Sequence, residues 1–130
     1  MPLLSVIIIT KNEAHNIQDC LKSVEWADEI IIVDSGSTDN TVELCRKYTD
    51  KILVTDWPGY GAQKQRALEM ATGEWVLSLD ADERVTHDLK ESILAAIPNT
   101  PYDAFEIFFE SEYCGKLIRF GDWWNDRQAV

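Results

Sequence analysis

The sequence predicts a doubly wound α/β domain in which a mainly parallel sheet carries helices on both faces. Four apolar runs of strand length, rich in β-branched residues, alternate with segments of helical periodicity. Near-continuous apolar strands are typical of a parallel sheet that is buried on both sides. Polar clusters follow three of these runs, at the strand ends where such folds bind their ligands. Together these features favour an α/β sheet with functional loops along one edge.

The expected strands are the apolar runs themselves, each bounded by polar turn residues. They cover Ser5 to Thr10, Glu29 to Val33, Lys51 to Val54 and Trp75 to Leu79. Apolar residues at helical spacing predict three helices between these strands. Their apolar faces are expected to contain Ile17, Leu21 and Val24 in the first helix, Val42, Leu44 and Cys45 in the second, and Ala67, Leu68 and Ala71 in the third.

A fourth helix is expected over Asp88 to Ile97, with Thr86 as its N-cap. The following "IPNTP" ends it, because proline cannot continue the helical hydrogen-bond ladder. The stretch "YDAFEIFFES" then suits an added strand or hairpin. We find no repeat, low-complexity tract or linker, so residues 1–130 are expected to form a single domain that belongs to a longer parent protein.

Charge and composition exclude several classes of function. The formal net charge of −11 disfavours nucleic-acid binding, because the chain would repel a phosphate backbone. No window approaches the ~20 apolar residues of a membrane span, and the first residues lack a signal-peptide pattern, so we expect a cytoplasmic location. Cys20, Cys45 and Cys114 are scattered, which argues against a disulfide framework or a structural zinc site.

Three polar clusters mark the predicted functional edge. They are "TKNEAHN" after the first strand, "DSGSTDNT" after the second and "DADE" after the fourth. The ends of these strands are neighbours in a doubly wound sheet. We therefore expect residues that are far apart in the sequence to line one crevice.

Asp80 and Asp82 of "DADE" are the sharpest candidate ligands. On an extended backbone, residues two apart point to the same side, so one cation would meet both carboxylates. Two hard oxygen ligands, completed by water and the phosphate oxygens of a substrate, suit Mg²⁺ or Mn²⁺. The alternative is a solvated acidic turn that caps the following helix.

Asp34 ends the second strand, where its carboxylate can accept hydrogen bonds from a nucleobase or a ribose. Most of the cluster that follows it also has a simpler explanation, since Ser37, Thr38 and Asp39 are preferred helix N-caps. In the same way, Asn12 and Glu13 are either ligand contacts or the opening turn of the first helix.

The opening of the third helix, "WPGYGAQKQRAL", carries Gln63, Lys64 and Arg66 at an end that favours anions, so Arg66 is expected near phosphate. It lacks the third glycine of a dinucleotide fingerprint, and the chain has no GK[ST] loop, which excludes dehydrogenase and P-loop functions. His15 and His87 are expected to be surface residues.

Three motifs together carry a specific resemblance. "SVIIITKNE", "IIIVDSGSTDNT" and "WVLSLDADE" resemble the nucleotide-sugar-binding half of family 2 glycosyltransferases of GT-A fold. Within that family the chain is most similar to bacterial β-1,4-glucosyltransferases of lipopolysaccharide core biosynthesis, through "DSGSTD", "GYGAQKQRAL" and "GDWWNDRQ". Ser35 departs from the family pattern, since many members carry an aspartate there.

The resemblance implies a UDP-linked nucleoside-diphosphate-sugar donor with glucose as its sugar, and a lipid-linked saccharide acceptor at the inner face of the membrane. It implies Thr10 and Glu13 near the base, Asp34 on the uracil or ribose, Asp80 facing the ribose, and Asp82 on Mg²⁺ or Mn²⁺. We assign Asn12, Gln63 and Arg66 to the same nucleotide-sugar-binding set.

Members of the family invert the anomeric carbon, using a carboxylate base that normally lies beyond residue 130. Glu83 and Asp122 are the candidates for that base within this chain. One rival hypothesis is a nucleotide-sugar-binding module without turnover. Another is a flavodoxin-like regulatory domain with Asp56 at the end of its third strand, but the polar clusters follow the other three strands.

Overall fold

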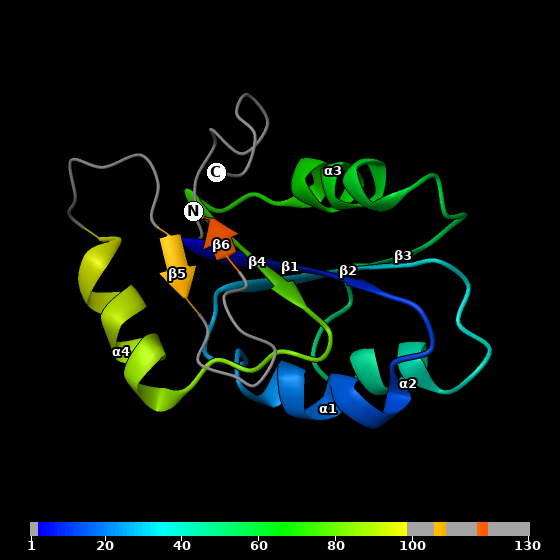
Figure 1. Cartoon of the computed structure of the whole chain (residues 1–130), viewed down its shortest axis with the longest axis horizontal. Helices are drawn as coiled ribbons and strands as arrows, with labels where there is room; N and C mark the ends of the chain where they lie inside the picture. Colours follow the sequence, from blue (N-terminus) through cyan, green and yellow to red (C-terminus); the bar gives the residue numbers. More distant parts are fainter. Residues whose placement is uncertain (1–2, 99–105, 109–116, 120–130) are drawn as a thin grey trace.

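Four parallel strands form the central sheet, which lies between helices in Figure 1. The computed structural model describes residues 3–98, and the backbone alone of residues 106–108 and 117–119. The strands are β1 (Leu4–Thr10), β2 (Glu29–Asp34), β3 (Ile52–Val54) and β4 (Trp75–Asp80). Their order is β3-β2-β1-β4, so that β1 is flanked by the two strands that end in aspartate.

Helices cover both faces of the sheet, as the sequence predicts. They are α1 (Ala14–Lys22), α2 (Thr41–Cys45), α3 (Tyr60–Met70) and α4 (His87–Ala96). In Figure 1, α1 and α2 lie below the sheet and α3 lies above it. The chain therefore has the doubly wound, mainly parallel α/β architecture.

Alternating residues of each strand supply two separate cores. Val6 and Ile8 of β1 pack with Ile17 of α1 on one side of the sheet. Ile7, between them, packs with Ala67 of α3 on the other side. Because both faces are covered, the strands read as continuous apolar runs rather than as alternating ones.

The element boundaries differ slightly from those expected. β2 and β4 each extend by one residue, so Asp34 and Asp80 are the last residues of their strands. α4 begins and ends one residue earlier than predicted, and the Thr86 side chain caps it by accepting the Leu89 N–H at 3.1 Å. Val24 is buried as expected, although it lies beyond the end of α1.

The inner face of α3 contains one residue that the prediction left out. Its fully buried residues are Gln63 and Ala67, while the predicted Leu68 and Ala71 pack against the same core as partly buried residues, Ala71 just beyond the end of the helix. An amide side chain thus occupies a core position that the apolar pattern did not indicate.

Residues 106–119 contain a short antiparallel pair. β5 (Glu106–Phe108) pairs with β6 (Leu117–Arg119), which confirms the expected hairpin, and β6 lies beside β4. Asp122 and Cys114 lie outside the described residues. None of the helices within the described ranges is both long and apolar enough to cross a bilayer.

Candidate functional site

Asp34, the last residue of β2, ties together the loops that follow β1 and β2. Its Oδ1 accepts the Thr10 hydroxyl at 2.6 Å and the Ser37 hydroxyl at 2.5 Å. Its Oδ2 accepts the backbone N–H groups of Gly36 and Ser37 at 2.9 and 2.7 Å. These bonds occupy the lone-pair sites of both oxygens, and the residue is fully buried.

The environment of Asp34 stabilises its ionised form. Burial acts to raise its pKa, but the hydrogen bonds from Ser37, Thr10 and Gly36 outweigh burial and hold the pKa below its usual value. Asp34 is therefore a buried anion at neutral pH. A ligand that bonds to it must replace one of the hydroxyl donors.

Asn12 joins the loop after β1 to the loop after β2 through hydrogen bonds. Its Oδ1 accepts the Thr38 N–H at 2.7 Å, while its own N–H donates to Ser37 Oγ at 2.8 Å. Its φ of 54° lies in the left-handed region, which asparagine tolerates better than most residues. Lys11 adds a bond from Nζ to the Gly36 carbonyl at 2.9 Å. The two loops consequently form one connected rim.

Side chains of the second loop cap α1. Glu13 is the N-cap of α1, but its side chain makes no capping bond. The Ala14 N–H donates to Asp39 Oδ2 at 3.2 Å, and the Glu13 N–H donates to Thr41 Oγ1 at 2.9 Å. Asn12 and Glu13 thus open α1, which is one of the two alternatives that the sequence left open, and the second loop supplies the acceptors for the first N–H groups.

Asp80 ends β4 on the other side of β1. The Tyr60 hydroxyl donates to its Oδ1 at 3.0 Å, and Lys64 Nζ lies 3.6 Å from the same oxygen. Its backbone N–H donates to Glu83 Oε1 at 2.8 Å. Glu83, a candidate base, therefore also stabilises the turn after β4.

Asp82 lies in that turn rather than on an extended strand. The Glu83 N–H bonds to the Asp80 carbonyl at 2.9 Å, which reverses the chain, and Ala81 is buried while Asp82 is exposed. The argument that extended geometry points Asp80 and Asp82 to the same side is wrong here. Their joint role as cation ligands remains a prediction.

The carboxylates at the carboxyl edge of the sheet fit a cation that takes only some of its ligands from the protein. No group of three His, Cys, Asp or Glu side chains in the described part of the chain can hold a metal ion. Asp80 and Asp82 offer two hard oxygen donors at most. That number suits Mg²⁺ or Mn²⁺ whose remaining ligands are water and the phosphate oxygens of a substrate.

Gln63 and Arg66 lie on α3, packed against β1 and β2. Gln63 is fully buried, and its Oε1 accepts a bond from Arg66 at 2.9 Å, while its Nε2 is buried without a partner. Arg66 also pairs with Asp56 at 2.8 Å. Its expected contact with phosphate would have to compete with this carboxylate.

The sheet register brings the three polar strand ends together. Thr10 lies opposite Asp34, and the preceding residue, Ile9, lies opposite Asp80. The predicted neighbourhood of these strand ends is thus confirmed.

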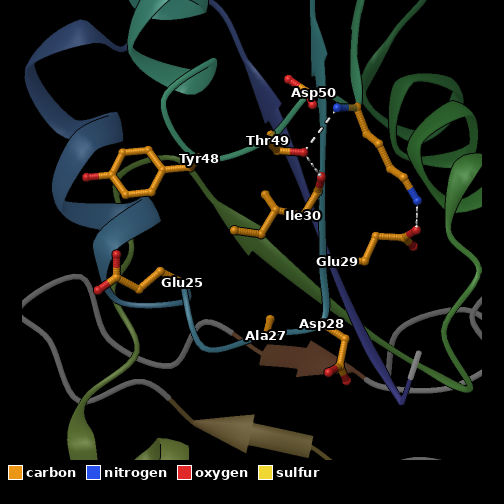
Figure 2. A pocket seen from close by; sticks show the side chains of 9 residues that line it. Glu25, Ala27, Asp28, Glu29, Ile30, Tyr48, Thr49 and Asp50 are labelled. Carbon is orange, nitrogen blue, oxygen red and sulfur yellow. Dashed lines mark hydrogen bonds and ion pairs between the residues drawn. The ribbon is translucent and has the colours of Figure 1, made fainter. Parts of the chain in front are cut away.

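A cavity of about 250 Å³ lies at the opposite edge of the sheet, around the amino end of β2. Glu25, Asp28 and Asp50 are among its lining residues (Figure 2).

The two described cysteines are not part of a reactive site. Cys20 and Cys45 are free and buried. Burial raises the pKa of the Cys20 thiol above its usual range and that of Cys45 to about 12, so both are neutral thiols. Cys20 Sγ donates to the Asp80 carbonyl at 3.6 Å.

The family model described as glycosyl transferase family 2 matches residues 5–120. The chain belongs to this family. A lipopolysaccharide core biosynthesis glycosyltransferase of Rhizobium meliloti, LpsC, is 43% identical over 93 residues, which cover 68% of this chain and 34% of that protein. An uncharacterized glycosyltransferase of Rickettsia felis is 42% identical over 94 residues, or 72% of this chain and 33% of that protein.

Solved structures of glycosyltransferases of GT-A fold share the architecture. Residues 1–349 of S. aureus TarS, in complex with UDP-GlcNAc, match 78% of this chain and 33% of that one with a TM-score of 0.67 and 31% identity. The mannosyltransferase PcManGT of Pyrobaculum calidifontis, with GDP-Man and Mn²⁺, gives 0.67 and 28%, over 79% and 34% of the chains. The chain spans about a third of the length of these relatives.

Family membership leaves no support for the flavodoxin-like hypothesis, and Asp56 is an exposed partner of Arg66. The sequence reasoning also missed Tyr60. The one sequence signal for its bond to Asp80 is that Tyr60 and Lys64 are four residues apart and so lie on the same face of a helix, where both side chains can reach one carboxylate.

Proposed function

We propose that this chain is the donor-binding part of an inverting, metal-dependent glycosyltransferase. The observation that carries the proposal is the register of β2, β1 and β4, which sets Asp34, Thr10 and Asp80 at one edge of a family 2 sheet. The donor is a nucleoside-diphosphate sugar, UDP-linked, with glucose as the sugar that the resemblance implies. The TarS complex with UDP-GlcNAc supports the nucleotide.

The rim residues have distinct roles in this proposal. Thr10, Asn12, Glu13 and Asp34 border the base and ribose, and Gln63 and Arg66 complete the nucleotide-sugar-binding set. Asp80 faces the ribose, and Asp82 would hold Mg²⁺ or Mn²⁺. The cation, when bound, neutralises the charge that develops on the departing diphosphate.

The acceptor is a lipopolysaccharide-core or related lipid-linked saccharide, met at the inner face of the membrane by a cytoplasmic protein with at most peripheral contact. The name of the R. meliloti relative supports this acceptor class. A carboxylate base would deprotonate the acceptor hydroxyl as the diphosphate leaves. Glu83 and Asp122 are the candidates in this chain.

Calorimetry with UDP tests the donor site. UDP is expected to bind the full chain more tightly with Mn²⁺ than without it, and Asp82→Ala should remove that dependence. Glu69→Ala, an exposed substitution on α3, is the matched control and should bind as the unmodified chain does. Binding that is indifferent to Mn²⁺ in the unmodified chain would contradict the role of Asp82.

A second candidate is nucleotide-sugar binding without turnover. One observation favours it: Glu83, the described candidate base, already accepts the Asp80 N–H at 2.8 Å. UDP-glucose hydrolysis or transfer separates the two functions. An enzyme releases UDP faster than the background rate, whereas a silent module binds the donor and leaves it intact.

A further inference from the structure

Exposed apolar side chains are concentrated beside the proposed donor site. Five large ones occur among the described residues, and Leu53, Val54, Trp57 and Tyr60 are four of them, all between residues 53 and 60. Trp57 and Tyr60 are 54% and 53% exposed. Scattered exposed apolar residues need no explanation, but two exposed aromatic rings that contact each other beside a proposed ligand site indicate an interaction surface.

Trp57 and Tyr60 are arranged as an aromatic pair. Their ring centroids are 6.2 Å apart, with an angle of 59° between the ring planes. Lys64, one helical turn after Tyr60, places Nζ 4.9 Å from the Tyr60 ring centroid. The rings therefore hold a defined geometry in spite of their exposure.

Both ends of this pair are anchored. The Tyr60 hydroxyl donates to Asp80 Oδ1 at 3.0 Å, which joins the pair to the end of β4. Arg66 donates to the carbonyl of Asp56 at 3.2 Å and pairs with its carboxylate, which fixes the residue before Trp57. The aromatic pair is thus held next to the carboxylate that we assign to the ribose.

We propose that Trp57 and Tyr60 form the surface on which the nucleobase of the donor stacks. The inference rests on the proposed function, in which Asp80 faces the ribose. The base is bonded directly to the ribose, so a flat group that is bonded to Asp80 lies within its reach. Bases stack on aromatic side chains through their π faces, whatever their hydrogen-bonding pattern.

Calorimetry on the full chain with two ligands tests the stacking. One is UDP with Mn²⁺, and the other is pyrophosphate with Mn²⁺, which lacks a base. Trp57→Ala and Tyr60→Ala are each expected to weaken UDP binding by about tenfold, the effect of removing one stacking ring. Pyrophosphate binding should stay unchanged. Trp57→Phe keeps an aromatic ring and should retain most of the UDP affinity.

Leu94→Ala is the matched control, since Leu94 is the exposed apolar residue on α4, and it should bind both ligands normally. Unchanged UDP affinity in Trp57→Ala and Tyr60→Ala would overturn the stacking proposal and leave the proposed function intact. Equal losses of affinity for UDP and for pyrophosphate would overturn it as well. The rings would then affect binding by positioning Asp80, and not by contact with the base. If the unmodified chain binds no UDP, the proposed function fails and this inference fails with it.

Discussion

Both ends of β2 carry a buried carboxylate, and the two are stabilised in different ways. Glu29 is the first residue of the strand and Asp34 the last, about 17 Å apart along it. Glu29 is only 6% exposed and Asp34 is fully buried. The pKa of each lies below its usual value. The difference between them lies in the partners.

At the amino end, Glu29 is neutralised by a cation. Its carboxylate accepts the Ser5 hydroxyl at 2.6 Å and the Thr72 N–H at 2.8 Å, and it pairs with Lys51 (Figure 2). Burial alone would raise the pKa of Glu29, but Lys51, Ser5 and Thr72 together lower it to about 2. This network joins β1, β2 and the segments before β3 and β4.

At the carboxyl end, neutral groups alone surround Asp34. Its donors are hydroxyls and backbone N–H groups from the two loops, and no Lys or Arg within residues 3–98 pairs with it. The negative charge is therefore stabilised by the dipoles of groups that also shape the rim. The comparison indicates that the amino edge stabilises the fold, whereas the carboxyl edge sets the geometry of the donor site that we propose.

The largest expected effect on stability is at the amino end. Glu29→Gln should lower the free energy of unfolding by about 3 to 4 kcal/mol, because it removes the ion pair with Lys51 and turns an amide N–H₂ toward existing donors. Urea denaturation measures this loss. The same variant, once folded, should bind UDP normally, and a large loss of UDP affinity would show that the amino edge is not purely structural.

Acid should weaken the fold chiefly through Glu29. A group whose pKa is lowered on folding, here from 4.5 to about 2, stabilises the fold above pH 4.5 and loses that contribution as the pH falls toward 2. The loss amounts to about 3 kcal/mol. Urea denaturation between pH 5 and pH 2 should show a steep decline that is much reduced in Glu29→Gln. Parallel declines would contradict the assignment to Glu29.

Asp34→Asn is expected to cost less stability but to impair binding. It turns an amide N–H₂ toward the Thr10 and Ser37 hydroxyls, which must then accept rather than donate, and it removes the charge, at about 2 kcal/mol of unfolding free energy. UDP affinity should fall as well, because the rim loses its shape. Ser37→Ala removes one donor and should give a smaller loss of both. Normal UDP binding by folded Asp34→Asn would remove the contrast between the two edges.

Asn12 should show the smallest effect of these. Asn12→Ala loses the bond to the Thr38 N–H and leaves at φ 54° a residue that tolerates this region less well than asparagine, which together should cost about 1 to 2 kcal/mol of unfolding free energy. Asn12→Gly loses the bond but tolerates that φ. Glycine should therefore be the less destabilising substitution, and the reverse order would rule out backbone strain.

The sequence predicted the positions of single strands and the features that follow from the fold class. The apolar runs gave the strands, and the doubly wound plan correctly made Asp34, Thr10 and Asp80 neighbours. The family resemblance added the chemistry. The scattered spacing of the cysteines also argued against a disulfide framework, and Cys20 and Cys45 are free and buried.

Most of what the sequence did not reveal concerns contacts between segments that are distant in sequence. Asp39 accepts the Ala14 N–H at the start of α1 from the loop after β2, a contact that the residues next to α1 do not indicate. In the sequence, Glu29 is only a polar residue at the start of a strand. Its bond from the Thr72 N–H forms in the folded chain and has no sequence signal. The prediction that Asp80 and Asp82 point to the same side failed for a local reason. The chain turns directly after Asp80, so the alternation of side chains along a strand no longer applies to Asp82.

Hydrogen–deuterium exchange with and without UDP and Mn²⁺ tests the division between the two edges most directly. The account predicts slower exchange, on ligand binding, in residues 10–13, 35–41 and 80–83 at the carboxyl edge. Residues 25–30 and 48–51, which surround the cavity at the amino edge, should exchange at unchanged rates. Protection confined to the amino edge would contradict the account, because the nucleotide would then bind at the wrong end of β2.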